Sequence, residues 1–150
     1  MHITFEANGP FGKVIGSFSG LDAAIVFDQD NLTASSIKAS VDVKTIETGI
    51  GLRNSDLREK EEWFNEAKYP SITLKSRQIQ KVGEGYKLLA DLTIKGVTKQ
   101  IEIPFKFTTS GTGAVFNGQF EINREDFGIG KSGGGVGKTV LIKLEVPVRK

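Results

Sequence analysis

The sequence contains no cysteine and a single histidine, His2, among its 150 residues. The absence of cysteine excludes disulfides, thiolate metal ligands and cysteine nucleophiles. His2 lies at the N-terminal end of the chain, where order is usually poor, so histidine-based acid–base and nucleophilic catalysis have no well-placed residue. No pair of carboxylates stands out by its spacing. The residues alone therefore make an enzyme the weaker hypothesis, and they predict no cofactor.

An excess of one charge is also missing, because 20 basic and 18 acidic residues give a formal net charge of +2. This balance offers no concentrated basic face for nucleic acid. The acidic residues Glu59, Glu61 and Glu62 are interleaved with Arg58 and Lys60, which is typical of a solvated helix face and not of a metal site. No apolar run approaches the ~20 residues that a membrane-spanning helix needs. The length predicts one domain, residues 1–150, with a core of its own.

Alternation of apolar and polar residues dominates the chain. It is clearest from Tyr86 to Ile94 and from Ile101 to Phe107, with a turn predicted at Lys95-Gly96. Period-two alternation indicates strands with one apolar face, so this stretch predicts a long antiparallel hairpin. Similar alternation occurs in residues 3–7, 13–19, 22–27, 37–43, 72–74, 116–122 and 140–148. About eight or nine strands are expected, and because open edges aggregate, they are expected to close into a barrel or a two-sheet sandwich.

One segment, Gly49 to Ala67, breaks the alternation and is predicted to be helical, either continuous or in short pieces. Leu57 and Phe64 are seven residues apart, as on one face of a helix, and Asp56 lies four residues before Lys60. Tyr69-Pro70 then stops the helix.

A glycine-rich loop precedes the last predicted strand. Its residues Ser132 to Thr139 resemble a phosphate-binding P-loop, although Ser132 stands where that motif has glycine. A P-loop must lead into a helix, whereas Thr139 begins an alternating strand. The loop is therefore predicted to connect strands and not to bind nucleotide.

The interior of such a barrel could be packed or hollow. Ten phenylalanines are available to fill it, while Ala39, Ala90 and Gly118 lie in the inward register and would leave room. Barrels of about eight strands either fill their interior with side chains or hold one small ligand. Patterning alone leaves both open.

Several sequence blocks, in order, carry a family resemblance: Val41–Thr48, Arg53, Trp63-Phe64, Lys68–Ile72, Asp91–Lys99 and Ile122–Ile129. Together, over about residues 3–148, they resemble the YceI-like family, also called polyisoprenoid-binding proteins. The resemblance implies an all-β fold, an extended antiparallel, eight-stranded, lipocalin-like β-barrel with a short helical insert. It also implies an enclosed isoprenoid chain, such as a polyprenyl phosphate or a quinone-like tail.

From this resemblance and the inward register we predict an apolar tunnel with fourteen lining residues: Phe5, Phe18, Ile37, Ala39, Val41, Trp63, Phe64, Leu74, Tyr86, Leu88, Ala90, Phe105, Phe116 and Phe120. The basic residues available for a polar head at the mouth are Arg53, Arg58 and Arg124, with Lys131 beside the glycine-rich loop.

The leading hypothesis is a non-enzymatic carrier or sequestering protein for an isoprenoid or similar amphiphile. The alternatives are an enzyme acting on a lipid or small molecule in the barrel, and an interaction domain whose barrel is packed. Family members are usually exported, so a periplasmic or secreted location is expected even though no signal peptide precedes the first strand in this sequence; a cytoplasmic location is the alternative. A homodimer that closes a barrel seam is a further possibility.

Overall fold

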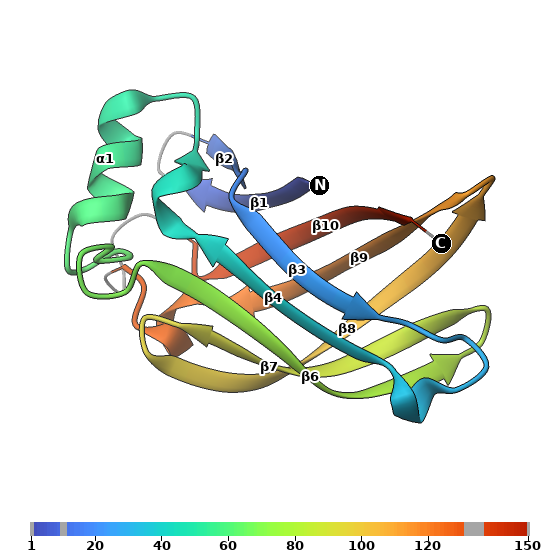
Figure 1. Ribbon diagram of the computed structural model, residues 1–150. Coiled ribbons are helices and arrows are strands. Elements are labelled where there is room, and N and C mark those ends of the chain that lie inside the picture. The colour runs from blue at the N-terminus through green and yellow to red at the C-terminus, as the bar shows by residue number, and fades with distance from the viewer. Residues whose placement is uncertain (1, 10–11, 131–136, 150) are drawn as a thin grey trace.

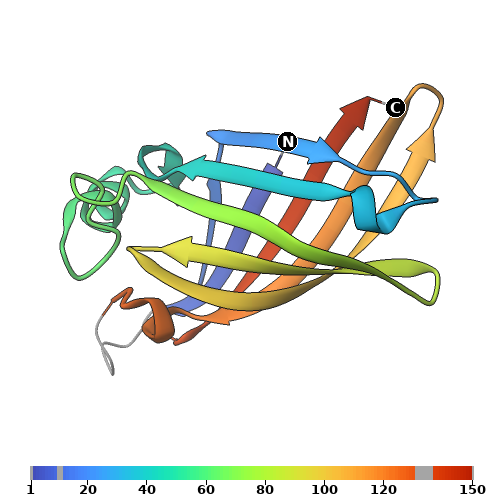
Figure 2. The same ribbon diagram turned by 60° about the horizontal axis from the view of Figure 1, so that its bottom comes forward.

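The computed structural model describes residues 2–9, 12–130 and 137–149. Its strands form one antiparallel sheet that curls around an apolar interior, with the β3–β4–β6–β7 part facing the β9–β10–β1 part (Figures 1 and 2). The strands are β1 (His2–Gly9), β2 (Gly12–Phe18), β3 (Leu21–Val26), β4 (Ser36–Asp42), β5 (Ile46–Glu47), β6 (Ser71–Val82), β7 (Gly85–Ile94), β8 (Val97–Ser110), β9 (Gly113–Asn123) and β10 (Thr139–Arg149).

The all-β, barrel-like prediction is confirmed, with a difference in strand number. Within the described residues the sheet has ten strands, and not eight, in the order β3-β4-β6-β7-β8-β9-β10-β1-β2-β5. Nine of them correspond to the alternating segments of the sequence. The tenth, β5, has two residues, too few to produce an alternation that could be recognised in the sequence.

The predicted central hairpin is formed by β7 and β8, which pair from Tyr86↔Phe105 to Ile94↔Val97. Its turn places both Lys95 and Gly96 at positive φ, 52° and 76°. Alternate β7 residues from Tyr86 to Ile94 are buried, because successive side chains of a strand point to opposite faces. The register predicted from the sequence is therefore correct here.

The helical insert is shorter than predicted. Helix α1 (Gly51–Glu59) ends where Lys60 adopts an extended conformation, and residues 60–68 continue as turns. The predicted Asp56–Lys60 ion pair is present at 3.7 Å. The helical relationship between Leu57 and Phe64 is wrong, since Phe64 lies in the turns, where its N–H donates to Leu57 O at 2.9 Å. The described part of the chain also forms three short 3₁₀ helices: η1 (Leu32–Ala34), η2 (Val43–Thr45) and η3 (Arg124–Phe127).

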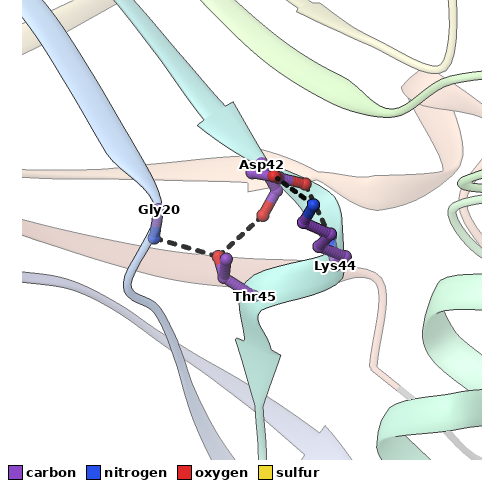
Figure 3. A network of polar contacts seen from close by, with 4 residues as sticks. All are labelled: Gly20, Asp42, Lys44 and Thr45. Atoms are coloured by element: carbon purple, nitrogen blue, oxygen red, sulfur yellow. Dashed lines mark hydrogen bonds and ion pairs between the residues drawn. The ribbon is translucent and has the colours of Figure 1, made fainter.

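The sheet has a seam between β2 and β3. These strands are consecutive in the chain, yet β2 pairs with β1 and β5 while β3 pairs with β4, and no ladder joins β2 to β3 among the described residues. Gly20, in the connection between β2 and β3, contacts η2 and the end of β4: its N–H donates to Thr45 Oγ1 at 3.0 Å (Figure 3), and its carbonyl accepts from Asp42 N at 3.0 Å. Thr45 Oγ1 in turn donates to Asp42 O at 2.7 Å. A Cβ on Gly20 would lie 2.7 Å from Thr45 Cγ2, so the approach requires glycine.

The two ends of the curled sheet differ. The helix end carries α1, the β7–β8 turn and η3, whereas the hairpin end carries the β6–β7 and β8–β9 turns and the β3–η1 connection (Figure 1). Most of the residues that resemble a P-loop, 132–136, lie outside the described residues, and Thr139 begins β10 as predicted. No helix in the described part of the chain has the length and apolar character needed to cross a bilayer.

Candidate functional site

An apolar inner cavity of about 160 Å³ lies between the two facing parts of the sheet. Thr73 is the one polar residue among the described residues of its wall. The wall includes nine residues of the predicted tunnel: Phe18, Ile37, Ala39, Val41, Leu74, Leu88, Phe105, Phe116 and Phe120. The cavity comes from the alternation of the strands, which directs one apolar face inward along each.

A second hollow, the helix-end pocket, has a volume of about 480 Å³ and opens toward α1. Four predicted tunnel residues line it: Phe5, Phe18, Trp63 and Phe64. The inner cavity and the helix-end pocket share four wall residues, Phe18, Ile72, Ile94 and Ile142. The two hollows are therefore neighbours along the axis of the sheet, with apolar side chains at their junction.

Two predicted tunnel residues are placed differently. Ala90 is fully buried, at 0% exposure, but it packs in a cluster with Leu88 and Ile103 and borders neither hollow. Tyr86 borders a shallower outer groove of about 910 Å³ along β7–β10. Sequence alternation gives the inward direction of a side chain, but it does not say whether that side chain meets a cavity or a packed neighbour.

The three candidate arginines also differ. Arg53 and Arg124 line the helix-end pocket, whereas Arg58 does not and its Nη2 donates to Ser55 Oγ at 3.3 Å. The fourth candidate, Lys131, lies outside the described residues.

Arg124, in η3, is buried at 3% exposure and organises the loop around it. Its Nε donates to Gly137 O at 3.0 Å and its Nη1 to Ile129 O at 2.8 Å. The guanidinium also lies 5.8 Å from the centre of the Trp63 ring. These contacts hold the guanidinium in the wall of the helix-end pocket.

Arg53 is held in place by Thr48, which follows β5. Its Nε donates to Thr48 Oγ1 at 2.9 Å, and its Nη2 donates to Thr48 O. Thr48 is fixed in turn by buried Asn54, whose Oδ1 accepts from Thr48 N at 2.8 Å and from Thr48 Oγ1 at 2.6 Å. The Asn54 amide also donates to Glu47, and this hydrogen bond, with that from Gly49 N, lowers the pKa of the Glu47 carboxyl.

Lys95 links three segments at the helix end by hydrogen bonds. Its Nζ donates to Glu61 O at 2.6 Å and to Gly128 O at 2.9 Å, so the β7–β8 turn is tied both to the turns after α1 and to the loop after η3. The pocket is thus formed by segments far apart in the sequence.

Sequence reasoning missed Phe27, which closes the hairpin end. Its ring lies edge-on to Tyr86, Phe105, Phe107 and Phe116, with centroid distances of 5.2, 5.9, 4.8 and 5.2 Å. It also missed cavity-wall residues on β3 and β10, namely Leu21, Ala23, Ile25, Ile142, Leu144 and Val146. Alternation within those two strands was the signal that could have identified them.

These features define a class of protein: a curled antiparallel β-barrel with an apolar interior that is polar at one end. Residues 1–148 match the YceI-like domain, and the chain belongs to that family. A UPF0312 protein of Yersinia pestis (strain Pestoides F) is 31% identical over 142 residues, which cover 91% of this chain and 73% of the relative.

Solved structures share the fold. Burkholderia cenocepacia BcnA superposes with a TM-score of 0.92 at 24% identity, covering 98% of this chain and 95% of that one. The Campylobacter jejuni YCEI protein gives a TM-score of 0.82 at 22% identity, covering 90% and 84%. A polyisoprenoid binding domain from Saccharophagus degradans, implicated in plant cell wall breakdown, gives 0.76 at 19% identity, covering 99% and 92%.

Proposed function

We propose that this protein binds the apolar tail of an isoprenoid or similar amphiphile in its barrel and carries or sequesters it without catalysis. The observation that carries the proposal is the adjacency of the inner cavity and the helix-end pocket through Phe18, Ile72, Ile94 and Ile142. A tail entering at the helix end would pass between these side chains and reach the inner cavity. Membership in the YceI-like family and the polyisoprenoid binding domain among its structural neighbours support this choice of ligand.

The physical driving force is burial of hydrocarbon. Each methylene group removed from water contributes ~0.8 kcal/mol, so a branched tail of a few isoprene units has enough driving force with no reacting group. The helix-end pocket, at about 480 Å³, falls in the range of roughly 300–1,000 Å³ that is typical of small-molecule sites. Polyprenyl phosphates and quinones with prenyl tails both fit this requirement. By family resemblance we also propose that the protein acts outside the cytoplasm.

The first test is organic extraction of the purified protein followed by mass spectrometry. Replacing either of two alanines by phenylalanine sharpens this test. Ala39 lines the inner cavity, whereas Ala90 packs against Leu88 and Ile103. The Ala39→Phe ring can occupy cavity space, so lipid-free stability should change little while long tails are lost or replaced by shorter ones. Ala90→Phe should instead cost ~1–3 kcal/mol, because a packed core has no room for the ring.

Denaturant unfolding of delipidated proteins and the lipid assay give both readouts. Equal destabilisation by the two substitutions, with no lipid recovered from wild type, would instead support a packed barrel.

A further inference from the structure

We infer that the barrel of this chain encloses no more than about four isoprene units of a tail, and that Phe27 is the end stop that sets this limit. The inference rests on the proposed function, because it concerns the tail of a ligand held in the barrel. It starts from the way the inner cavity ends, at the ring cluster of the hairpin end.

Strand β10 measures the length available to a tail. Val140 and Ile142 line the helix-end pocket, and Ile142 and Val146 line the inner cavity. From Val140 to Val146 the strand advances ~20 Å, at ~3.3 Å per residue. Carbon–carbon bonds of about 1.5 Å at about 111° advance ~1.25 Å each, so an isoprene unit, with four such bonds in its main chain, covers roughly 5 Å. About four extended units therefore fill both hollows.

The inner cavity ends where its wall meets Phe27. Ile25 lines the cavity near the end of β3, and Phe27 follows it at the next position of the inward register. On β7, Leu88 lines the wall, and the next inward residue toward the hairpin end, Tyr86, has its ring 5.2 Å from that of Phe27. On β9, the wall includes Phe116, whose ring also lies 5.2 Å from Phe27. A tail that reaches this end would therefore meet the Phe27 ring.

Phe27 is fixed in this position by its neighbours. Its ring is also edge-on to Phe105 and Phe107, at 5.9 and 4.8 Å, and aromatic pairs favour this geometry. Two residues further on, Gln29 Nε2 donates to Tyr86 Oη at 3.2 Å and links the segment after β3 to β7. Phe27 is half-buried, so one part of it packs in the ring cluster while another meets water, as expected of a residue that closes an end.

A stop at one end makes affinity depend on tail length up to a limit. Each unit that fits inside removes hydrocarbon from water and adds affinity. A unit beyond the limit stays in water at the helix end and adds nothing. Shortening the stop should therefore raise the limit, whereas filling the cavity should lower it.

The experiment measures the affinity of delipidated protein for four neutral alcohols whose tails grow by one isoprene unit at a time: geraniol, farnesol, geranylgeraniol and geranylfarnesol. Trp63, the single tryptophan of the chain, lines the helix-end pocket, so its fluorescence reports binding. We expect wild-type affinity to rise about tenfold or more with each unit up to geranylgeraniol, and by less than about twofold from there to geranylfarnesol.

Two substitutions shorten the stop by different amounts, Phe27→Leu and Phe27→Ala. Both should bind geranylfarnesol more tightly than geranylgeraniol, by about threefold for leucine and about tenfold for alanine. Their affinity for farnesol should be unchanged, which also shows that each variant is folded. Val26→Ala is the matched control, since this neighbouring side chain is 60% exposed, and it should keep the wild-type limit. Ala39→Phe, which fills part of the inner cavity, should lower the limit to farnesol or geraniol.

Two results would overturn the inference and leave the proposed function standing. One is a wild-type affinity that still rises about tenfold from geranylgeraniol to geranylfarnesol, and the other is a limit that does not move in either Phe27 variant. Should Phe27→Ala fail to fold, Phe27→Leu decides the second. Failure of wild type to bind any of the four alcohols would overturn both the inference and the proposed function.

Discussion

The two ends of the curled sheet are closed by different chemistry. At the hairpin end, Phe27 lies among the rings of Tyr86, Phe105, Phe107 and Phe116. At the helix end, the closing groups are a short helix and a loop fixed by Arg124, Lys95 and backbone carbonyls. Aromatic packing makes a blind apolar end, whereas hydrogen-bonded loops make an end that can expose polar groups to water. The difference gives the interior a direction, with an aromatic end at Phe27 and a polar end at α1.

The largest expected loss of stability comes from a substitution at the hairpin end. Phe27→Ala should destabilise the protein by ~2–4 kcal/mol, less than for a fully buried ring because Phe27 is half-buried. The neighbouring Val26 is 60% exposed, so Val26→Ala should change stability by less than ~0.5 kcal/mol. Denaturant unfolding of both variants measures the contrast. Similar small losses in the two variants would mean that the ring cluster does not stabilise the hairpin end.

A smaller effect is expected from glycine substitution at the helix end. A Cβ on Gly130 would lie 2.6 Å from Arg124 Nη1 and 2.8 Å from the Trp63 ring, at a φ of 76°. Gly111, in the β8–β9 turn, also has a positive φ, 59°, but nothing lies within 4 Å of an added Cβ. Both alanine variants share the backbone cost of ~1 kcal/mol, and Gly130→Ala should lose about 1 kcal/mol more through the displaced contacts.

Thermal or denaturant unfolding gives the difference between these two variants, and Trp63 fluorescence reports the local change. Equal losses in Gly130→Ala and Gly111→Ala would show that the Arg124–Trp63 contact tolerates displacement.

The smallest effect concerns pH. The pKa of Glu47 is lowered in the folded protein by the Asn54 hydrogen bond, so the charged carboxylate contributes stability above its ordinary pKa of ~4.3. That contribution should disappear as the pH falls through the lowered folded pKa. Wild type should therefore be more stable than Glu47→Gln at neutral pH, with the two converging in acid. Unfolding at a series of pH values tests this, and a gap that stays constant into acid would contradict it.

The sequence allowed the direction of side chains to be predicted, but not their position along the barrel. Alternation placed Leu88, Phe105 and Phe116 inward, and they are buried. It could not show that Phe27, just after β3, would reach across to β7, β8 and β9, because that contact depends on which strands become neighbours. The positions of β2 and β3 in the sheet could not be predicted for the same reason. Consecutive strands usually pair, whereas here β3 is the first strand in the order of the sheet and β2 is the last but one.

The same limit applied to the arginines. Composition identified Arg53, Arg58 and Arg124 as available cations, but their roles depend on Thr48, Ser55 and the carbonyls of Ile129 and Gly137. Those partners are brought together by the fold and have no fixed spacing in the sequence.

The seam between β2 and β3 bears on how strictly the fold fixes the width of the barrel interior. In a fully closed barrel the strand number and the shear fix the bore, and widening it would break ladder hydrogen bonds. Here no ladder joins β2 to β3 among the described residues, and Gly20, which lies between the two strands in the chain, hydrogen-bonds with Thr45 of η2 and Asp42 of β4. Because no ladder hydrogen bonds would have to break between β2 and β3, we expect the width of the interior to be less strictly fixed than in a closed barrel.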